Sequence, residues 1–408
     1  MSEVFTIGLL GHGTVGAAFA ELVAARADDI ERATGRRPQV GGVLTRSRGD
    51  GAQIVAESDL VVEVMGGLDP SRDLVLRALR SGTPVVSANK QLISRHGPDL
   101  WEAAQAGGTQ LRFEAAVAGV VPVIRVLSES LAGAEIERIH GIVNGTTNFI
   151  LTQMAATGAS YGDALGEAQA LGYAESDPTE DVTGLDAAAK MAILARLAFG
   201  SWVHVDEVVC EGIEHLTSAD MAYAQEFGLG LKLLGTAERV GDALSVRVHP
   251  AFLYAGHPLA SVSGPFNAVT IESPAITEIT LSGPGAGGPQ TASAVLGDVV
   301  SIMLGERPMP AAGPDLAIEK DVASAFYLHL EVADRPGVLA QVAERLGLQG
   351  ISVKSVIQEG MGDDARLVMV THTVLESRFF AAVEMIGALD FMRAAPRAIR
   401  VIDEQFTA

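Results

Sequence analysis

The chain has 408 residues, and its 29 lysines and arginines against 50 aspartates and glutamates give a net charge of −21, which excludes a general binder of nucleic acid or anionic membrane. A hydrophobic content of 48% excludes a disordered chain, and the length predicts two or three globular domains. One cysteine, no signal peptide and no long apolar run exclude an intrachain disulfide and a membrane anchor, and predict a cytoplasmic protein.

The N-terminal part of the chain alternates short apolar strands with helical stretches. Residues 4–10 form the first predicted strand, and a helix through Ala24 follows a glycine-rich turn. Further strands are predicted at 40–44, 60–65, 84–87 and 111–118. This alternation predicts an α/β fold with a doubly wound parallel sheet of the Rossmann type.

The glycine-rich turn has the spacing of a dinucleotide-binding loop. Gly11 permits a tight turn, Gly13 lets the backbone approach a pyrophosphate, and Gly16 allows close packing of helix on strand. An ordinary glycine turn is the competing interpretation. The complete predicted loop is Gly11, His12, Gly13, Thr14, Val15 and Gly16.

The end of the second predicted strand reads Leu44-Thr45-Arg46-Ser47-Arg48 and lacks the carboxylate that would accept a ribose 2′-hydroxyl. Arg46 and Arg48 suit a 2′-phosphate instead, which favours NADP over NAD. The alternative is that both arginines are simply solvated, and the sequence does not separate the two.

Lysine is rare in this chain, at positions 90, 190, 232, 320 and 354 only. Lys90 follows Ser87-Ala88-Asn89 at the carboxyl end of a predicted strand, where ligands of open α/β sheets bind. Lys190 lies four residues after Asp186 on a predicted helix, so the two side chains share a face. A surface ion pair and a lysine poised for proton transfer both fit this spacing. The acidic run before it, Glu175 to Asp186, also admits a metal site.

The middle of the chain is predicted to mix strands and helices, and its end is predicted to follow a regular order of them. A strand near 136–143 leads to Asn144-Gly145-Thr146-Thr147-Asn148; helices are predicted at 149–155, 161–171 and 184–199, and a second glycine cluster at 283–288 opens a helix at 291–304. Pro308, Pro310 and Pro314 indicate a linker. Strands at 326–332, 351–358, 365–371 and 398–402, with helices at 338–347 and 375–387 and a turn over Gly360, Gly362, Asp363 and Asp364, predict a ferredoxin-like βαββαβ unit.

Several of these motifs resemble the homoserine dehydrogenase family, over about residues 4–305. The most specific is Ala168-x-x-x-Gly172-Tyr173-Ala174-x-x-Asp177-Pro178-x-x-Asp181-Val182-x-Gly184-x-Asp186-x-x-x-Lys190. Glu63-Val64-Met65-Gly66-Gly67, Ala88-Asn89-Lys90, Asn144-Gly145-Thr146-Thr147-Asn148 and Gly283-Pro284-Gly285-Ala286-Gly287 are also similar, in the family's order. Asp334-Arg335-Pro336-Gly337 resembles the first turn of an ACT domain, a small effector-binding unit.

The resemblance implies reversible, NAD(P)H-dependent reduction of L-aspartate 4-semialdehyde to L-homoserine, in threonine, methionine and isoleucine biosynthesis. It implies that Lys190 is the proton donor and that Lys90 contacts cofactor and substrate, with Asp186 beside them. The implied substrate residues are Glu175, Asp181, Tyr173, Gly145 and Thr146, and the implied cofactor residues beyond the first loop are Arg46, Ser87, Lys90, Gly285 and Gly287.

A monovalent cation such as Na⁺ is also implied by the family resemblance. Its candidate ligands are the Glu114 carboxylate and the carbonyls of Val117, Gly119 and Val121. The segment departs from the family here, since Ala116-Val117-Ala118-Gly119-Val120 replaces a commoner Ser-Val-Gly-Gly-Gly.

The expected domains are a dinucleotide-binding domain over 1–130 with the helix 285–305, a substrate and dimerisation domain over 131–284, a linker over 306–324 and an ACT-like regulatory domain over 325–408. A homodimer or homotetramer and feedback by an amino acid, with threonine first, are expected. Removal of 321–408 is expected to leave catalysis and abolish feedback.

Two other functions compete with this interpretation. Another Rossmann semialdehyde oxidoreductase, of the acylating kind, needs an activated cysteine, whereas Cys210 lies in an apolar run beside Glu211. A non-catalytic nucleotide and amino-acid sensor would not need both Lys90 and Lys190, and a turnover assay separates it from an enzyme.

Overall fold

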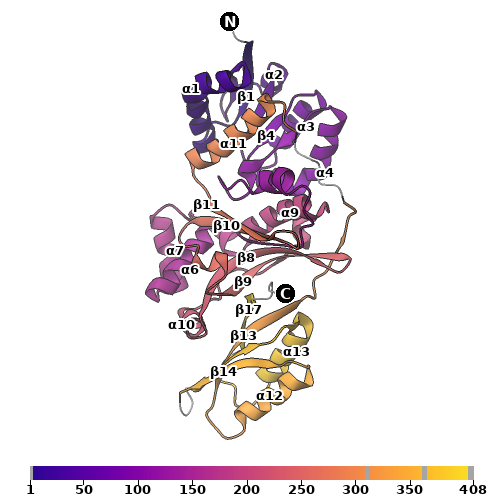
Figure 1. Cartoon of the computed structure of the whole chain (residues 1–408). Helices are drawn as coiled ribbons and strands as arrows, with labels where there is room; N and C mark the ends of the chain where they lie inside the picture. The colour runs from indigo at the N-terminus through magenta and orange to yellow at the C-terminus, as the bar shows by residue number, and fades with distance from the viewer. Residues whose placement is uncertain (1–2, 308–312, 361–364, 403–408) are drawn as a thin grey trace.

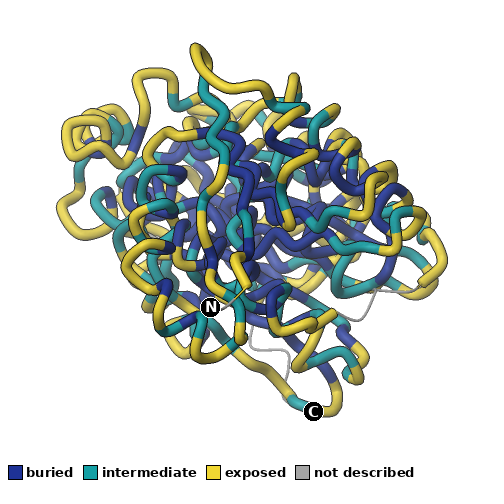
Figure 2. Tube along the Cα trace, turned by 90° about the horizontal axis from the view of Figure 1, so that it is seen from above, coloured by how far each residue is buried: buried dark blue, intermediate teal, exposed yellow. Residues whose placement is uncertain are grey.

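The computed structural model describes residues 3–307, 313–360 and 365–402. The chain forms three parts that follow one another along the long axis of the molecule, with the N-terminal sheet at one end and the C-terminal unit at the other (Figure 1). Viewed from above, buried residues gather in the middle of the molecule and exposed residues lie around its outside (Figure 2).

The N-terminal part is a parallel five-stranded sheet in the order β2-β1-β3-β4-β5. Its strands are nearly all apolar, as expected where helices cover both faces. α1 and α11 pack on one face through Phe19, Val23, Val295 and Val299, and α3 and α4 pack on the other. The bounds are β1 Glu3–Leu10, α1 Thr14–Thr34, β2 Arg36–Leu44, α2 Gly51–Ala56, β3 Leu60–Glu63, α3 Ser71–Arg80, β4 Val85–Ser87, α4 Lys90–Ala106, β5 Leu111–Arg112 and α11 Gly288–Met303.

The doubly wound sheet is therefore confirmed, but the strand predicted over 111–118 is wrong after its second residue. β5 ends at Arg112 and a short 3-10 helix, η1 (Glu114–Ala116), follows. Ala118 and Gly119 then adopt positive φ angles of 57° and 65°. The Glu114 carboxylate accepts the backbone N–H groups of Ile124 and Arg125, both at 2.9 Å, which folds the chain back on itself.

The middle part is an antiparallel sheet in the order β11-β10-β6-β8-β9, with helices on one face. β6 leads directly into α6, and the first turn of α9 approaches that junction. The bounds are β6 Arg138–Ile142, α6 Gly145–Thr157, α7 Tyr161–Ala170, α8 Thr179–Val182, α9 Leu185–Phe199, β7 Val209–Cys210, α10 Ser218–Glu226, β8 Leu229–Val240, β9 Ala243–Tyr254, β10 Phe266–Ser273 and β11 Thr277–Pro284.

The C-terminal unit has the predicted βαββαβ order. Its strands pair as β17-β13-β15-β14, and its helices pack on one face around Phe326, Leu328 and Phe379. The predicted turn residues Gly362, Asp363 and Asp364 lie outside the described residues. The bounds are β13 Ala323–Val332, α12 Val338–Leu348, β14 Val353–Glu359, β15 Ala365–Thr371, α13 Glu376–Gly387 and β17 Arg397–Ile402.

The C-terminal unit is not a separate sheet. β17 pairs in parallel with β9, so the middle and C-terminal strands form one continuous sheet. The segment predicted as a linker also takes part, since β12 (Ala317–Ile318) pairs with β9. Pro308 and Pro310 lie outside the described residues.

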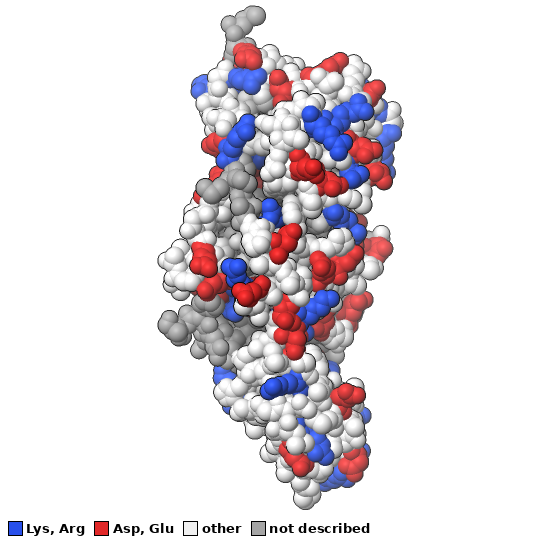
Figure 3. Space-filling model, turned by 90° about the vertical axis from the view of Figure 1, so that its right-hand side faces the viewer, with Lys and Arg blue, Asp and Glu red and all other residues white. Residues whose placement is uncertain are grey.

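The distribution of surface charge and the length of the helices can be compared with what nucleic acid or a membrane would require. The face shown in Figure 3 intersperses acidic and basic side chains rather than gathering the basic ones. No helix within the described ranges is both long and apolar enough to cross a lipid bilayer.

Candidate active site

The two lysines singled out by the sequence meet at one carboxylate. The Lys190 ammonium donates to Asp186 Oδ2 at 2.7 Å and to the Val143 carbonyl at 2.6 Å. The Lys90 ammonium lies 2.9 Å from the other oxygen, Asp186 Oδ1. Asp186 is 4% exposed, so a buried carboxylate joins a lysine from α9 to one from the first turn of α4.

This arrangement keeps the carboxylate ionised. Burial alone would raise the pKa of Asp186, but the charges of Lys190 and Lys90 and their hydrogen bonds hold it well below its usual range. Burial likewise opposes the charge on Lys90, but the charge and hydrogen bond of Asp186, together with the charges of Glu180 and Asp181, outweigh it and raise the pKa of Lys90. Asp186 therefore stays negative at neutral pH and orients both ammonium groups.

Asn144 completes this cluster and was not among the predicted site residues. Its Oδ1 caps α6 by accepting the N–H of Thr147 at 2.9 Å. Its Nδ2 donates to Asp181 Oδ1 at 2.7 Å and to Asp186 Oδ2 at 2.8 Å. A signal was present, because an asparagine between a strand and a helix is a preferred N-cap. The cap leaves the amide nitrogen free to join two carboxylates.

The other predicted substrate residues surround this cluster at different distances. Thr146 is buried and donates to the Tyr173 carbonyl at 2.7 Å, and Gly145 packs against the Pro265 carbonyl. Burial raises the pKa of Asp181, with the neighbouring Asp186 charge adding to the effect. Glu175 is exposed, and its backbone carbonyl accepts a hydrogen bond from the Gln169 side chain.

The first glycine loop has the geometry that its spacing predicts. Gly11 has φ +107° and lies so close to the backbone of Val64 that a Cβ would fall 2.8 Å from its carbonyl carbon. A Cβ on Gly16 would lie 2.2 Å from the Gly11 carbonyl oxygen, whereas one on Gly13 would meet nothing within 4 Å. Gly13 caps α1 without a side-chain hydrogen bond, which leaves N–H groups open to an anion.

The second glycine cluster lies against the first. A Cβ on Gly288 would be 3.0 Å from the Thr14 side chain, and one on Gly285 would be 2.4 Å from Asn267. A Cβ on Gly119 would likewise lie only 2.5 Å from the Gly285 carbonyl oxygen, so the two backbones are in contact. Gly288 thus lies against the first residue of α1, whereas Gly285 packs on Asn267 and Gly119. His12, Arg46 and Arg48 are exposed.

The Ser87 hydroxyl, predicted to contact the cofactor, is buried and already has a protein partner. Its hydroxyl donates to Glu63 Oε2 at 2.6 Å, and Glu63, fully buried, also accepts from Met65 N–H at 2.9 Å. Burial raises the pKa of Glu63. Asn89, beside it, caps α4 through Leu92 N–H and so fixes the turn that Lys90 begins. Glu63 was not among the predicted site residues, although it begins the Glu63-Val64-Met65-Gly66-Gly67 motif that resembles the family.

Glu114, the carboxylate implied for a monovalent cation, is buried beside Asp298, and Arg125 and Arg112 lie 3.5 and 3.9 Å from that second carboxylate. Burial and the neighbouring Asp298 raise the pKa of Glu114 to about 7, and burial raises that of Asp298 to about 6. Such carboxylates would gain from a cation, and the tight backbone turn at Ala118 and Gly119 fits carbonyl ligation. Glu114 and the carbonyls of Val117, Gly119 and Val121 would hold it.

The structure gives less support to the two alternatives, a metal site and a cysteine nucleophile, than to the lysine and aspartate cluster. Within the described ranges, no three histidine, cysteine or carboxylate side chains cluster as a metal site would require, the acidic run included. Cys210 is no activated nucleophile, because burial and Glu211 raise the pKa of its thiol to about 11. A cavity of about 240 Å³ lined by Trp101, Phe113 and Arg112 includes neither Lys90 nor Lys190.

Comparison with known proteins agrees with this geometry. Family models for homoserine dehydrogenase, for its NAD-binding domain and for the ACT domain match residues 122–300, 11–114 and 327–390. Homoserine dehydrogenases of Corynebacterium glutamicum and Synechocystis are 43% and 40% identical, covering 97% of this chain and 95% and 99% of theirs.

Solved structures give the same result. A homoserine dehydrogenase from Thiobacillus denitrificans superposes with a TM-score of 0.94 at 37% identity over 99% of this chain and 100% of that one. A hyperthermophilic archaeal homoserine dehydrogenase in complex with NADPH superposes with a TM-score of 0.66 at 28% identity, over 75% of this chain and 99% of that one. The chain belongs to the homoserine dehydrogenase family, oxidoreductases with a nicotinamide-binding domain, and carries a C-terminal ACT domain.

Proposed function

We propose that Lys190 is the residue that exchanges a proton with the substrate in the reversible reduction of L-aspartate 4-semialdehyde to L-homoserine. The nicotinamide cofactor, when bound, supplies the hydride that reaches the aldehyde carbon. Lys190 gives its proton to the aldehyde oxygen as that bond forms and takes it back from the hydroxyl in reverse. The carrying observation is the pair of lysines on the two oxygens of buried Asp186.

The surrounding residues hold the substrate in this proposal. Asp181 and Glu175 are carboxylates for the substrate ammonium group, and Lys90 supplies positive charge where cofactor and substrate meet. Tyr173, Gly145 and Thr146 shape the wall, supported by the Thr146–Tyr173 hydrogen bond. Asn144, bound to Asp181 and Asp186, fixes the spacing between binding and proton transfer. Glu175 joins from its exposed position when substrate binds.

The cofactor interpretation follows the glycine loops. The pyrophosphate would rest against Gly13 and the uncapped start of α1, between Gly11, His12, Thr14, Val15 and Gly16, with Gly285 and Gly287 alongside. Ser87, at the end of β4, and Lys90 border the nicotinamide end. Arg46, exposed after β2, favours NADP. A monovalent cation such as Na⁺ would be held by the Glu114 carboxylate and by the carbonyls of Val117, Gly119 and Val121.

The proposed setting is amino-acid biosynthesis leading to threonine, methionine and isoleucine, in the cytoplasm, by a homodimer or homotetramer. The proposed domains are 1–130 with 285–305, 131–284 and 325–408. The ACT domain would bind an amino-acid effector, with threonine first.

Initial rates with homoserine and either NADP⁺ or NAD⁺, with and without threonine, test this. We expect homoserine oxidation with a higher kcat/KM for NADP⁺, and inhibition by threonine. Absence of turnover with both cofactors would favour the non-catalytic sensor. Turnover without any amino-acid effect would refute the feedback alone.

A further inference from the structure

The ACT domain and the catalytic part are joined by paired strands and by packed, buried side chains. β17 pairs with β9 through Arg400, Val401 and Ile402, opposite Ala251, Phe252 and Leu253. The Phe252 and Tyr327 rings, both fully buried, lie 5.0 Å apart across the junction. The two parts therefore share backbone hydrogen bonds and a core.

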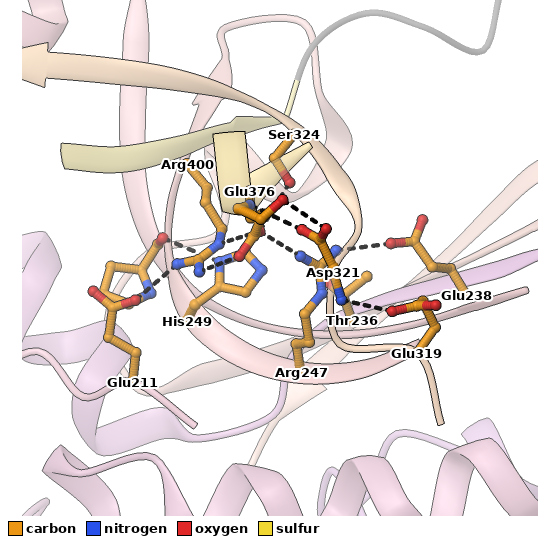
Figure 4. Close-up of polar contacts among 12 residues, drawn as sticks. Glu211, Thr236, Glu238, Arg247, His249, Glu319, Asp321, Ser324, Glu376 and Arg400 are labelled. Carbon is orange, nitrogen blue, oxygen red and sulfur yellow. Dashed lines mark hydrogen bonds and ion pairs between the residues drawn. The ribbon is translucent and has the colours of Figure 1, made fainter. Parts of the chain in front are cut away.

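Arg400 lies at the centre of a buried charged network on this junction (Figure 4). It holds Glu376, the first residue of α13, in a two-pronged pair with both distances 2.7 Å. Its remaining nitrogen donates to Glu211 Oε2 at 2.7 Å, in the catalytic part. Arg400 is 8% exposed, so its charge-assisted pair with Glu376 forms largely away from water, whereas the Glu211 side chain is 38% exposed.

A second arginine ties the same carboxylate to the middle sheet. Arg247, on β9, donates to Glu376 Oε1 at 2.7 Å and to Glu238 at 2.8 Å. Removal of one partner from such a network leaves uncompensated buried charge. Both arginines therefore pair with Glu376. Of the two, only Arg400 also pairs with Glu211.

Glu211 belongs to a segment that backs the active-site turn. Ile213 N–H donates to the Val182 carbonyl at 2.9 Å, and the Cys210 thiol donates to the Thr183 carbonyl at 3.2 Å. A Cβ on Gly212 would lie 2.4 Å from the Val182 carbonyl oxygen, so the two backbones are in contact.

The supported turn is short. Residues 183 and 184 join α8 to α9; Asp181 lies in the last turn of α8 and Asp186 in the first turn of α9. Any displacement of residues 210–213 would therefore reach both carboxylates that Asn144 bridges.

We infer that Arg400 and Glu211 are positioning residues of the active site: the ACT domain, through this ion pair, holds segment 210–213 against the turn that carries Asp181 and Asp186. This inference rests on the proposed catalytic role of Asp186 and Lys190. It makes the ACT domain part of the basal enzyme, and it makes the Arg400–Glu211 pair the place where an effector's influence enters the catalytic part.

The test variant is Glu211→Gln in the full chain. Its side chain is 38% exposed, and the change leaves the Arg400–Glu376 pair intact, so folding should survive. We expect kcat/KM for homoserine to fall about three- to tenfold. The dissociation constant for NADP⁺ should stay within about twofold, since the glycine loops do not touch this segment.

Glu238→Gln is the matched control, because it removes one carboxylate from the same network without touching segment 210–213. It should leave kcat/KM near wild type. Hydrogen exchange at Ile213 and over residues 182–188 should rise in Glu211→Gln and not in Glu238→Gln. This readout separates the inference from the proposed function, because it needs no turnover.

A double-mutant cycle with Arg400→Gln closes the test. If the pair acts as one unit, the double variant should be no worse than the more impaired single variant. Wild-type kcat/KM and unchanged exchange in Glu211→Gln would overturn the inference, even if Arg400→Gln failed to fold. Equal losses in Glu211→Gln and Glu238→Gln would overturn it too.

Discussion

At the scale of single residues, Asp186 organises the candidate site, because its two oxygens are addressed by lysines from different parts of the chain. The i,i+4 spacing of Asp186 and Lys190 was readable from the sequence, since it is a local property of a helix. The contacts of Asn144 were not, because its two carboxylate partners lie 37 and 42 positions away. The exposed side chain of Glu175 was likewise not readable.

Asn144→Ala tests the bridge between the carboxylates. The variant removes the shared donor, so Asp181 and Asp186 should repel each other and kcat/KM for homoserine should fall about tenfold or more. The lost cap should also cost about 1 kcal/mol of stability. Initial rates and thermal unfolding measure both effects.

Ser160→Ala is the matched control for Asn144→Ala, because Ser160 caps α7 in the same way. It should lose similar stability and keep its activity. Equal activities of the two variants would contradict a role for Asn144 beyond capping.

Glu272 predicts a pH dependence of stability. Burial raises its pKa to about 7, with Arg138 acting in the opposite direction, against about 4.3 in an unfolded chain. Because the folded pKa is raised, the contribution to stability is fully present below about pH 4.3 and is lost as pH rises through about 7. Glu272→Gln should therefore flatten the dependence of the melting temperature on pH between those limits.

The control for this change is Glu278→Gln, since Glu278 lies opposite Glu272 on β11 and is exposed. It should change the slope far less. Identical slopes in wild type and Glu272→Gln, measured by thermal unfolding across the window, would contradict the assignment.

At the scale of elements, the alternation of strands and helices was predictable because buried parallel strands and amphipathic helices leave distinct patterns. The strand over 111–118 was predicted too long. Most of this apolar run instead forms a 3-10 helix and a backbone turn. The Glu114 carboxylate stabilises the turn by accepting the N–H groups of Ile124 and Arg125. Apolar content records burial and does not distinguish these conformations.

The first glycine loop allows a prediction with a built-in comparison. Gly13→Ala should fold with an unchanged melting temperature, because its Cβ meets no atom within 4 Å, but should raise the KM for NADP⁺ about tenfold by occupying the pyrophosphate approach. Gly16→Ala should instead lower the melting temperature, because its Cβ would lie 2.2 Å from the Gly11 carbonyl oxygen. Equal melting temperatures for both variants would contradict these packing roles.

At the scale of the whole molecule, the ACT domain could be recognised from the sequence, but its union with the catalytic part could not. The pairing of β17 with β9 joins residues about 150 positions apart in the chain. Neither strand carries a local signal that names its partner. The linker expected over 306–324 also contains β12, which pairs with β9.

Removal of residues 321–408 should therefore affect more than feedback. It would leave the 251–253 edge of β9 without its β17 partner and uncover Phe252, so we expect a melting temperature lower by about 5 °C or more and a tendency to associate. Thermal unfolding and sedimentation measure these effects. A truncated protein as stable and as monodisperse as the intact one would contradict the structural role of the junction.

The most direct measurement of the central claim is homoserine turnover by Lys190→Arg, combined with a titration of NADP⁺ binding. Arginine keeps the positive charge beside Asp186 but is effectively never deprotonated, so it cannot exchange a proton. Turnover should fall at least about a hundredfold, while the NADP⁺ dissociation constant stays within about threefold. Turnover near the wild-type rate would contradict the assignment of Lys190 as the proton-exchanging residue.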